Sequence, residues 1–221
     1  MAKLNLVIFD CDGTLVVSEE ANNKVISDAL KNIGFANYKP EICLQKFRGL
    51  DSKQIIKILD KENNDFDVEI FEKSIEQTSM SFMSEIKAVK NADLVLNKLT
   101  LNKCVVSNGV RQNVISSLEQ NDLLKFFHKE NIITCLEGEN AKPAPDMFFR
   151  AAKNFSCAID QVLVIEDSEA GIEAAKAAGM IAVGFTGTAI IKERRKSKLL
   201  ASGADYIIDD LSEILDIAHL C

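Results

Sequence analysis

Near its start the chain reads Leu6-Val7-Ile8-Phe9-Asp10-Cys11-Asp12-Gly13-Thr14-Leu15. The apolar run of residues 4–9, interrupted only by Asn5, predicts a short strand buried on both faces, as strands of parallel sheets are. In an open parallel sheet, ligands bind just beyond the carboxyl ends of the strands. We therefore expect Asp10 and Asp12, which follow this strand, to lie in a ligand-binding site.

One residue separates Asp10 from Asp12, and Gly13 gives the backbone the freedom for a tight turn, so both carboxylates can face one pocket. They repel each other there unless a cation or a proton separates them. A hard ion such as Mg2+ takes oxygen ligands, and one acid can then be the nucleophile while the other gives a proton. The alternatives are an acidic turn or a fragment of a calcium loop. Thr-Leu-Val-Val follows Gly13, whereas a calcium loop needs further acids.

Composition limits the class of protein. With 221 residues, 47% hydrophobic and 27% charged, the chain is typical of a soluble globular protein with one main core and a small accessory domain. The net charge of -7 argues against nucleic-acid binding. The basic cluster at residues 192–198 is interpreted as the solvated face of a late helix. We expect a cytoplasmic monomer without a membrane span or signal peptide.

The six cysteines form no Cys-Xaa-Xaa-Cys pair, and the chain has only two histidines, so a zinc cluster is not expected. We expect reduced, mostly buried thiols. Cys11 lies between the two acids, and we assign it a packing role.

The order of elements predicts the architecture. Residues 16–85 show helical periodicity without a convincing strand, with helices at 21–33, 42–47, around 55–59 and 67–86. From Asn91 on, helices alternate with strands at 103–106, 132–134, 162–165, 181–185 and 206–208. The sequence predicts an α/β fold: a doubly wound, Rossmann-like parallel sheet formed by residues 1–15 and 86–221, with a helical cap inserted at 16–85.

Further polar motifs follow the predicted strands. Ser107-Asn108-Gly109 offers a hydroxyl, an amide and backbone N–H groups for an anion, or else a plain helix cap. Lys142 precedes two prolines, and Asp146 is expected to cap the next helix; Lys142 could neutralise a phosphate, or be merely exposed. Glu166-Asp167 ends a very apolar strand, and a metal shared with Asp10 would supply the partner that buried acids need.

In these motifs the chain resembles the haloacid dehalogenase superfamily of phosphotransferases. The motifs are Asp10–Leu15, Ser107–Gly109, Lys142–Asp146 and Glu166–Ser168, and they occur in the order of that superfamily. The chain is most similar to the β-phosphoglucomutase-like branch, which has a small helical cap after the first strand. The resemblance implies a Mg2+-dependent phosphatase of a small phosphorylated metabolite, of the sugar phosphate, phosphogluconate or phosphoglycolate type.

The resemblance also implies roles for single residues. Asp10 would form an aspartyl-phosphate, and Asp12 would act as general acid and base. The metal would be held by Asp10, by the backbone carbonyl of Asp12 and by Asp167, with Glu166 binding directly or through water. The phosphoryl group would be held by Ser107, Asn108, Gly109 and Lys142.

The helical cap is the least explicit part of the sequence. Arg48 precedes Gly49 after a predicted helix, where the branch has a substrate-binding Arg or Lys; the alternative is an arginine that favours the helix dipole. Two positions depart from the branch: Val17 replaces a usual Asp, and Asn22 replaces the histidine of the mutases. Asn22 favours hydrolysis. A phosphomutase remains an alternative, and a receiver-like domain or a non-catalytic phosphate-binding protein is a weaker one.

Overall fold

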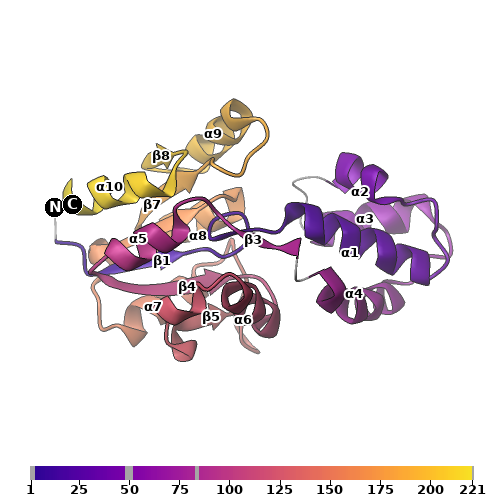
Figure 1. The fold of residues 1–221 in the computed structure, drawn as a ribbon, viewed down its shortest axis with the longest axis horizontal. Helices are drawn as coiled ribbons and strands as arrows, with labels where there is room; N and C mark the ends of the chain where they lie inside the picture. The colour runs from indigo at the N-terminus through magenta and orange to yellow at the C-terminus, as the bar shows by residue number, and fades with distance from the viewer. Residues whose placement is uncertain (1–2, 48–51, 83–84, 221) are drawn as a thin grey trace. The chain divides into compact units, whose positions relative to one another are not determined.

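The computed structural model describes residues 3–47, 52–82 and 85–220. The larger of its two sheets has six strands, which all run parallel to their neighbours in the order β5-β4-β1-β6-β7-β8 (Figure 1). The strands are β1 (Leu6–Phe9), β4 (Asn102–Ser107), β5 (Ile132–Thr134), β6 (Val162–Glu166), β7 (Ile181–Phe185) and β8 (Tyr206–Ile208). The predicted doubly wound parallel sheet is confirmed.

Strand β1 lies at the centre of this sheet, paired with β4 on one side and β6 on the other. Its four residues have no exposed surface, which explains why an uninterrupted apolar run forms it. The chain first adds β4 and β5 on one side of β1 and then returns to add β6, β7 and β8 on the other. The strand order thus reverses beside β1, and doubly wound sheets bind ligands at such a reversal.

Helices cover the sheet. They are α5 (Ala92–Lys98), α6 (Arg111–Gln120), α7 (Asp146–Asn154), α8 (Glu169–Ala177), α9 (Lys192–Ala201) and α10 (Ile214–Leu220). Side chains of α7, α8 and α9 share one apolar cluster with alternate strand residues such as Leu6 and Ile8, because successive strand residues point to opposite faces. Helices α5 and α10 lie side by side (Figure 1).

A short antiparallel ribbon of β2 (Val16–Val17) and β3 (Lys87–Ala88) departs from the expectation that residues 16–85 hold no strand. Two residues are too few for an alternating pattern to indicate a strand. The chain divides into two compact units, Met1–Val17 with Lys87–Cys221, and Ser18–Ile86. We call the second unit the helical insert.

The helical insert contains, in its described residues, α1 (Glu19–Asn32), α2 (Pro40–Phe47), α3 (Ser52–Glu62) and α4 (Val68–Phe82). It has an apolar cluster of its own, in which Leu30, Phe47 and Leu59 are buried. Gly34 follows α1 with a φ of 98°, a left-handed conformation common at helix ends. The predicted insertion of helices after the first strand is confirmed. Within the described residues no helix combines the length and the apolar character that a membrane crossing needs.

Candidate active site

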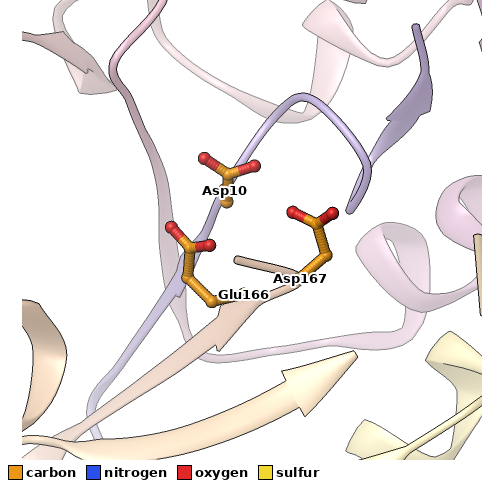
Figure 2. Close-up of side chains that lie close together, drawn as sticks. All are labelled: Asp10, Glu166 and Asp167. Carbon is orange, nitrogen blue, oxygen red and sulfur yellow. The ribbon is translucent and has the colours of Figure 1, made fainter. Parts of the chain in front are cut away.

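Three carboxylates meet where β1 and β6 end (Figure 2). Asp10 follows β1, Glu166 is the last residue of β6, and Asp167 comes next. One oxygen of each lies within 4.8 Å of the others. The register places Phe9 beside Ile165, and the backbone N–H of Asp10 still donates to the Ile165 carbonyl at 3.0 Å. The pairing of two parallel strands therefore creates an acidic cluster that could hold a metal ion.

The ammonium group of Lys142 lies buried beside this cluster. Its Nζ donates to Asp10 Oδ1 at 2.8 Å and to the Val106 carbonyl at 2.7 Å, and it also forms an ion pair with Glu166. Burial disfavours the charge of Lys142, but the charges of Asp10 and Glu166 outweigh it and raise the pKa of Lys142 above its ordinary value. Lys142 thus stays a cation at the site.

The Ser107–Gly109 turn supports Lys142. The backbone N–H of Lys142 donates to Asn108 Oδ1 at 2.9 Å, and Asn108 Nδ2 donates back to the Lys142 carbonyl at 3.2 Å. The Ser107 hydroxyl oxygen accepts from the Gly109 N–H at 3.0 Å. Asn108 therefore holds the loop of Lys142, a task that the sequence did not indicate.

Asp12, in the turn after β1, is not a member of the three-carboxylate cluster, although its charge still contributes to raising the pKa of Asp167. Asp12 is exposed, and its Oδ2 would lie 3.6 Å from a Cβ placed on Gly109, so its carboxylate lies beside the Ser107–Gly109 turn. Gly13 has a φ of 89°, and a Cβ there would lie 2.3 Å from Asp167 Oδ2, so the turn requires glycine. Cys11 is fully buried, and burial raises the pKa of its thiol, in keeping with a packing role.

The charges of the cluster do not balance within it. Burial and the Glu166 charge raise the pKa of Asp10 well above its ordinary value, against the opposing effect of Lys142. Burial and the Glu166 charge likewise raise the pKa of Asp167 to about 7, while Arg195 opposes the shift. One lysine cannot neutralise three carboxylates, and a divalent cation fits both the missing charge and the oxygen donor set.

Glu166 is fully buried, and each of its oxygens has a partner in the protein. Oε1 pairs with Lys142, while Oε2 accepts from the Ser168 hydroxyl at 2.8 Å and from the Ser168 N–H at 3.2 Å. The carboxylate also packs against Gly171, where an added Cβ would lie 1.9 Å from the Glu166 Cδ. Glu166 is therefore locked in place by three neighbouring residues.

The structure differs from the sequence predictions at Asp146 and Arg195, and a third prediction, at Arg48, lies outside the described residues. Asp146 does not cap α7: Pro145 occupies the N-cap position and Asp146 is the first helical residue; its carboxylate accepts from the Asn140 N–H at 3.4 Å instead. Arg48 lies outside the described residues, and its role stays a prediction. Arg195 was assigned to a solvated face, yet its Nη1 donates to the Asp167 carbonyl at 2.9 Å.

Comparisons with known proteins agree on one family. The profile of the haloacid dehalogenase-like hydrolases matches residues 7–185. The 6-phosphogluconate phosphatase of Escherichia coli (strain K12) is 29% identical over 185 residues, 81% of each chain. The 2-deoxyglucose-6-phosphate phosphatase 1 of Saccharomyces cerevisiae is 28% identical, over 95% of this chain and 89% of its own. A haloacid dehalogenase-like protein of Agrobacterium tumefaciens has a solved structure with a TM-score of 0.80, at 28% identity over 98% of both chains.

Proposed function

The chain belongs to the haloacid dehalogenase-like hydrolases, and on that premise we propose that it is a Mg2+-dependent phosphatase of small phosphorylated sugars or sugar acids. One observation carries the proposal: the Asp10 carboxylate lies at the carboxyl edge of the sheet, next to a buried lysine and two further acids. Two relatives that are phosphatases of phosphorylated sugars or sugar acids support this substrate class.

Asp10 is the nucleophile of the proposed reaction. One of its oxygens attacks the phosphorus atom in line, the bond from phosphorus to the leaving oxygen breaks, and an aspartyl-phosphate forms. Asp12, exposed beside the Ser107–Gly109 turn, gives its proton to the leaving oxygen. Asp12 then takes a proton from the water that attacks the phosphorus, and inorganic phosphate and free Asp10 are released.

The three-carboxylate cluster is the proposed metal site. Asp10, Asp167 and the backbone carbonyl of Asp12 would hold Mg2+, which when bound neutralises charge on the phosphoryl oxygens. Both oxygens of Glu166 already have partners on Lys142 and Ser168. This supports the alternative in which Glu166 acts through water.

The phosphoryl group would contact Ser107, Gly109 and Lys142. The Ser107 oxygen accepts a hydrogen bond from the Gly109 N–H, and a hydroxyl that accepts in this way can still donate its proton to an anion. Lys142 supplies a cation close to Asp10, where negative charge gathers in the transition state. Asn108 is also a proposed contact of the phosphoryl group, and its two hydrogen bonds to the Lys142 backbone hold the lysine loop beside it.

The proposal is tested by measuring the release of inorganic phosphate from 6-phosphogluconate, 2-deoxyglucose 6-phosphate, phosphoglycolate and glucose 1-phosphate in the presence of Mg2+. At least one ester should be hydrolysed, and Asp10→Asn should lower kcat by about 100-fold or more while leaving the circular dichroism spectrum unchanged. Turnover by Asp10→Asn within tenfold of the wild type would contradict the assignment of the nucleophile. Interconversion of glucose phosphates without net phosphate release would favour the phosphomutase.

A further inference from the structure

Two side chains from the last third of the chain reach the acid-bearing turns. The hydroxyl of Thr188 donates to the Gly13 carbonyl at 2.7 Å, and Arg195 Nη1 donates to the Asp167 carbonyl at 2.9 Å. Both side chains are half-buried. Thr188 lies in the segment between β7 and α9, and Arg195 lies in the first turns of α9. The segment from Thr188 to Arg195 thus donates one hydrogen bond to the turn after β1 and one to the turn after β6.

The two residues held in this way also touch each other. A Cβ on Gly13 would lie 2.3 Å from Oδ2 and 2.9 Å from Oδ1 of Asp167, so the Asp167 carboxylate lies directly against Gly13. Thr188 and Arg195 therefore act on the two sides of a single contact. At that contact, Asp167 packs against the turn that follows Asp10.

The segment that carries Thr188 and Arg195 is itself anchored. The backbone N–H and the hydroxyl of Thr186 both donate to the Ile208 carbonyl of β8, at 2.9 and 3.1 Å. Leu199, one helical turn after Arg195, is fully buried in the apolar cluster beneath α9. A group can position its neighbours only if it is fixed, and these contacts fix both ends of the segment.

We propose that Thr188 and Arg195 are positioning residues that set the affinity of the acidic cluster for a divalent cation. The inference rests on the proposed function, because it takes Asp10 and Asp167 as metal ligands. Residues that orient metal ligands without touching the metal change affinity when they are replaced. Thr188 orients the nucleophile turn, and Arg195 orients Asp167.

Arg195 has two effects on a cation, and they have opposite signs. Its positive charge repels the cation, so its removal should tighten binding if charge were its only contribution. Its hydrogen bond keeps Asp167 in place, so removal should weaken binding if position matters more. The direction of the change in Mg2+ affinity therefore separates a positioning residue from a nearby charge.

The test is the titration of Mg2+ into the substrate-free protein by isothermal calorimetry. Arg195→Met should raise the Kd for Mg2+ about tenfold, the lower end of such effects, and Thr188→Val should raise it by about threefold. Arg195→Lys and Thr188→Ser keep a donor and should restore part of the affinity. Arg194→Met removes the same charge from an exposed position of the same helix and should leave the Kd within about twofold.

Activity and melting temperature complete the experiment. At saturating Mg2+, kcat of Arg195→Met should return to within about threefold of the wild type, because the metal ligands themselves are intact. If Arg195 only stabilised the fold, its replacement would lower the melting temperature without changing the Kd for Mg2+. Equal or tighter Mg2+ binding by both Arg195→Met and Thr188→Val overturns the inference alone. A wild type that binds no Mg2+ overturns the proposed metal site and the inference with it.

Discussion

Replacing Gly171 with alanine should destabilise the protein, although alanine is the better helix former. Gly171 lies in the first turn of α8, and an added Cβ would lie 1.9 Å from the Cδ and 2.0 Å from the Oε1 of Glu166. The methyl group and the carboxylate cannot occupy this space together. Gly171→Ala should therefore displace Glu166 from Lys142 and Ser168, its hydrogen-bond partners.

The magnitude follows from two opposing contributions. Alanine in place of glycine stabilises a helix by about 1 kcal/mol. Separating a buried ion pair costs about 3–5 kcal/mol, because a charge is left without its partner. The difference predicts that Gly171→Ala lowers the free energy of unfolding by about 2–4 kcal/mol, or the melting temperature by about 4–16 °C for a protein of this size.

A double-mutant cycle measured by thermal and urea unfolding in EDTA provides the assay. Glu166→Ala removes the carboxylate that occupies the space, so Gly171→Ala introduced into that variant should stabilise it, by about 1 kcal/mol. The effect of the same substitution should thus reverse its sign with the background. If Gly171→Ala stabilises the wild type as well, the close packing of Glu166 on α8 is wrong.

Three further predictions concern the chemistry. Asp12→Ala should lower kcat for alkyl phosphates by a factor of about 10²–10⁴, because a poor leaving group needs a proton from the general acid. It should lower kcat much less for an aryl phosphate with a good leaving group. Equal losses on both substrates would show that Asp12 is not the general acid. EDTA should abolish turnover and lower the melting temperature, whereas Mg2+ at about 100 times its Kd should restore about 2.7 kcal/mol of stability; unchanged values in both measurements would exclude the metal site. Since the pKa of Asp167 is raised to about 7, calorimetry should find Mg2+ affinity rising with pH through that value, because the proton competes with the metal. The metal-free protein should lose stability as the pH rises from about 4 to about 7, since the folded pKa lies above the unfolded one, and an opposite trend in either measurement would contradict the shift.

The meeting of Asp10 and Glu166 could be predicted from the sequence because it depends on one rule. Each follows an apolar run that forms a buried parallel strand, and parallel strands of one sheet end at the same edge. The neighbourhood of Lys142 was harder to predict. Its distance of 2.8 Å to Asp10 depends on the loop that Asn108 holds, and no periodicity describes a loop.

The basic helix shows why other residues were missed. In the run of charges from Lys192 to Lys198, composition alone indicates a solvated surface. Arg195, however, lies four residues before the buried Leu199 and shares its helix face, which is the signal that could have distinguished it. The error at Asp146 has a similar cause: an acid near a helix start favours the dipole at several positions, and only the backbone shows which residue is the cap.

The central place of β1 in the sheet affects the order in which the protein folds during its synthesis. Leu6–Phe9 pairs with residues 102–105 and 162–165, while the apolar cluster of the helical insert lies entirely within residues 26–75. As the chain leaves the ribosome, we expect the helical insert to fold first, because its contacts are closer together in the sequence. At that stage β1 has not yet paired with either β4 or β6. Asp10 meets Glu166 only when the strand added beyond residue 161 closes against it. In this order of events, the proposed active site forms only after the helical insert has folded and the strand at residues 162–166 has been made.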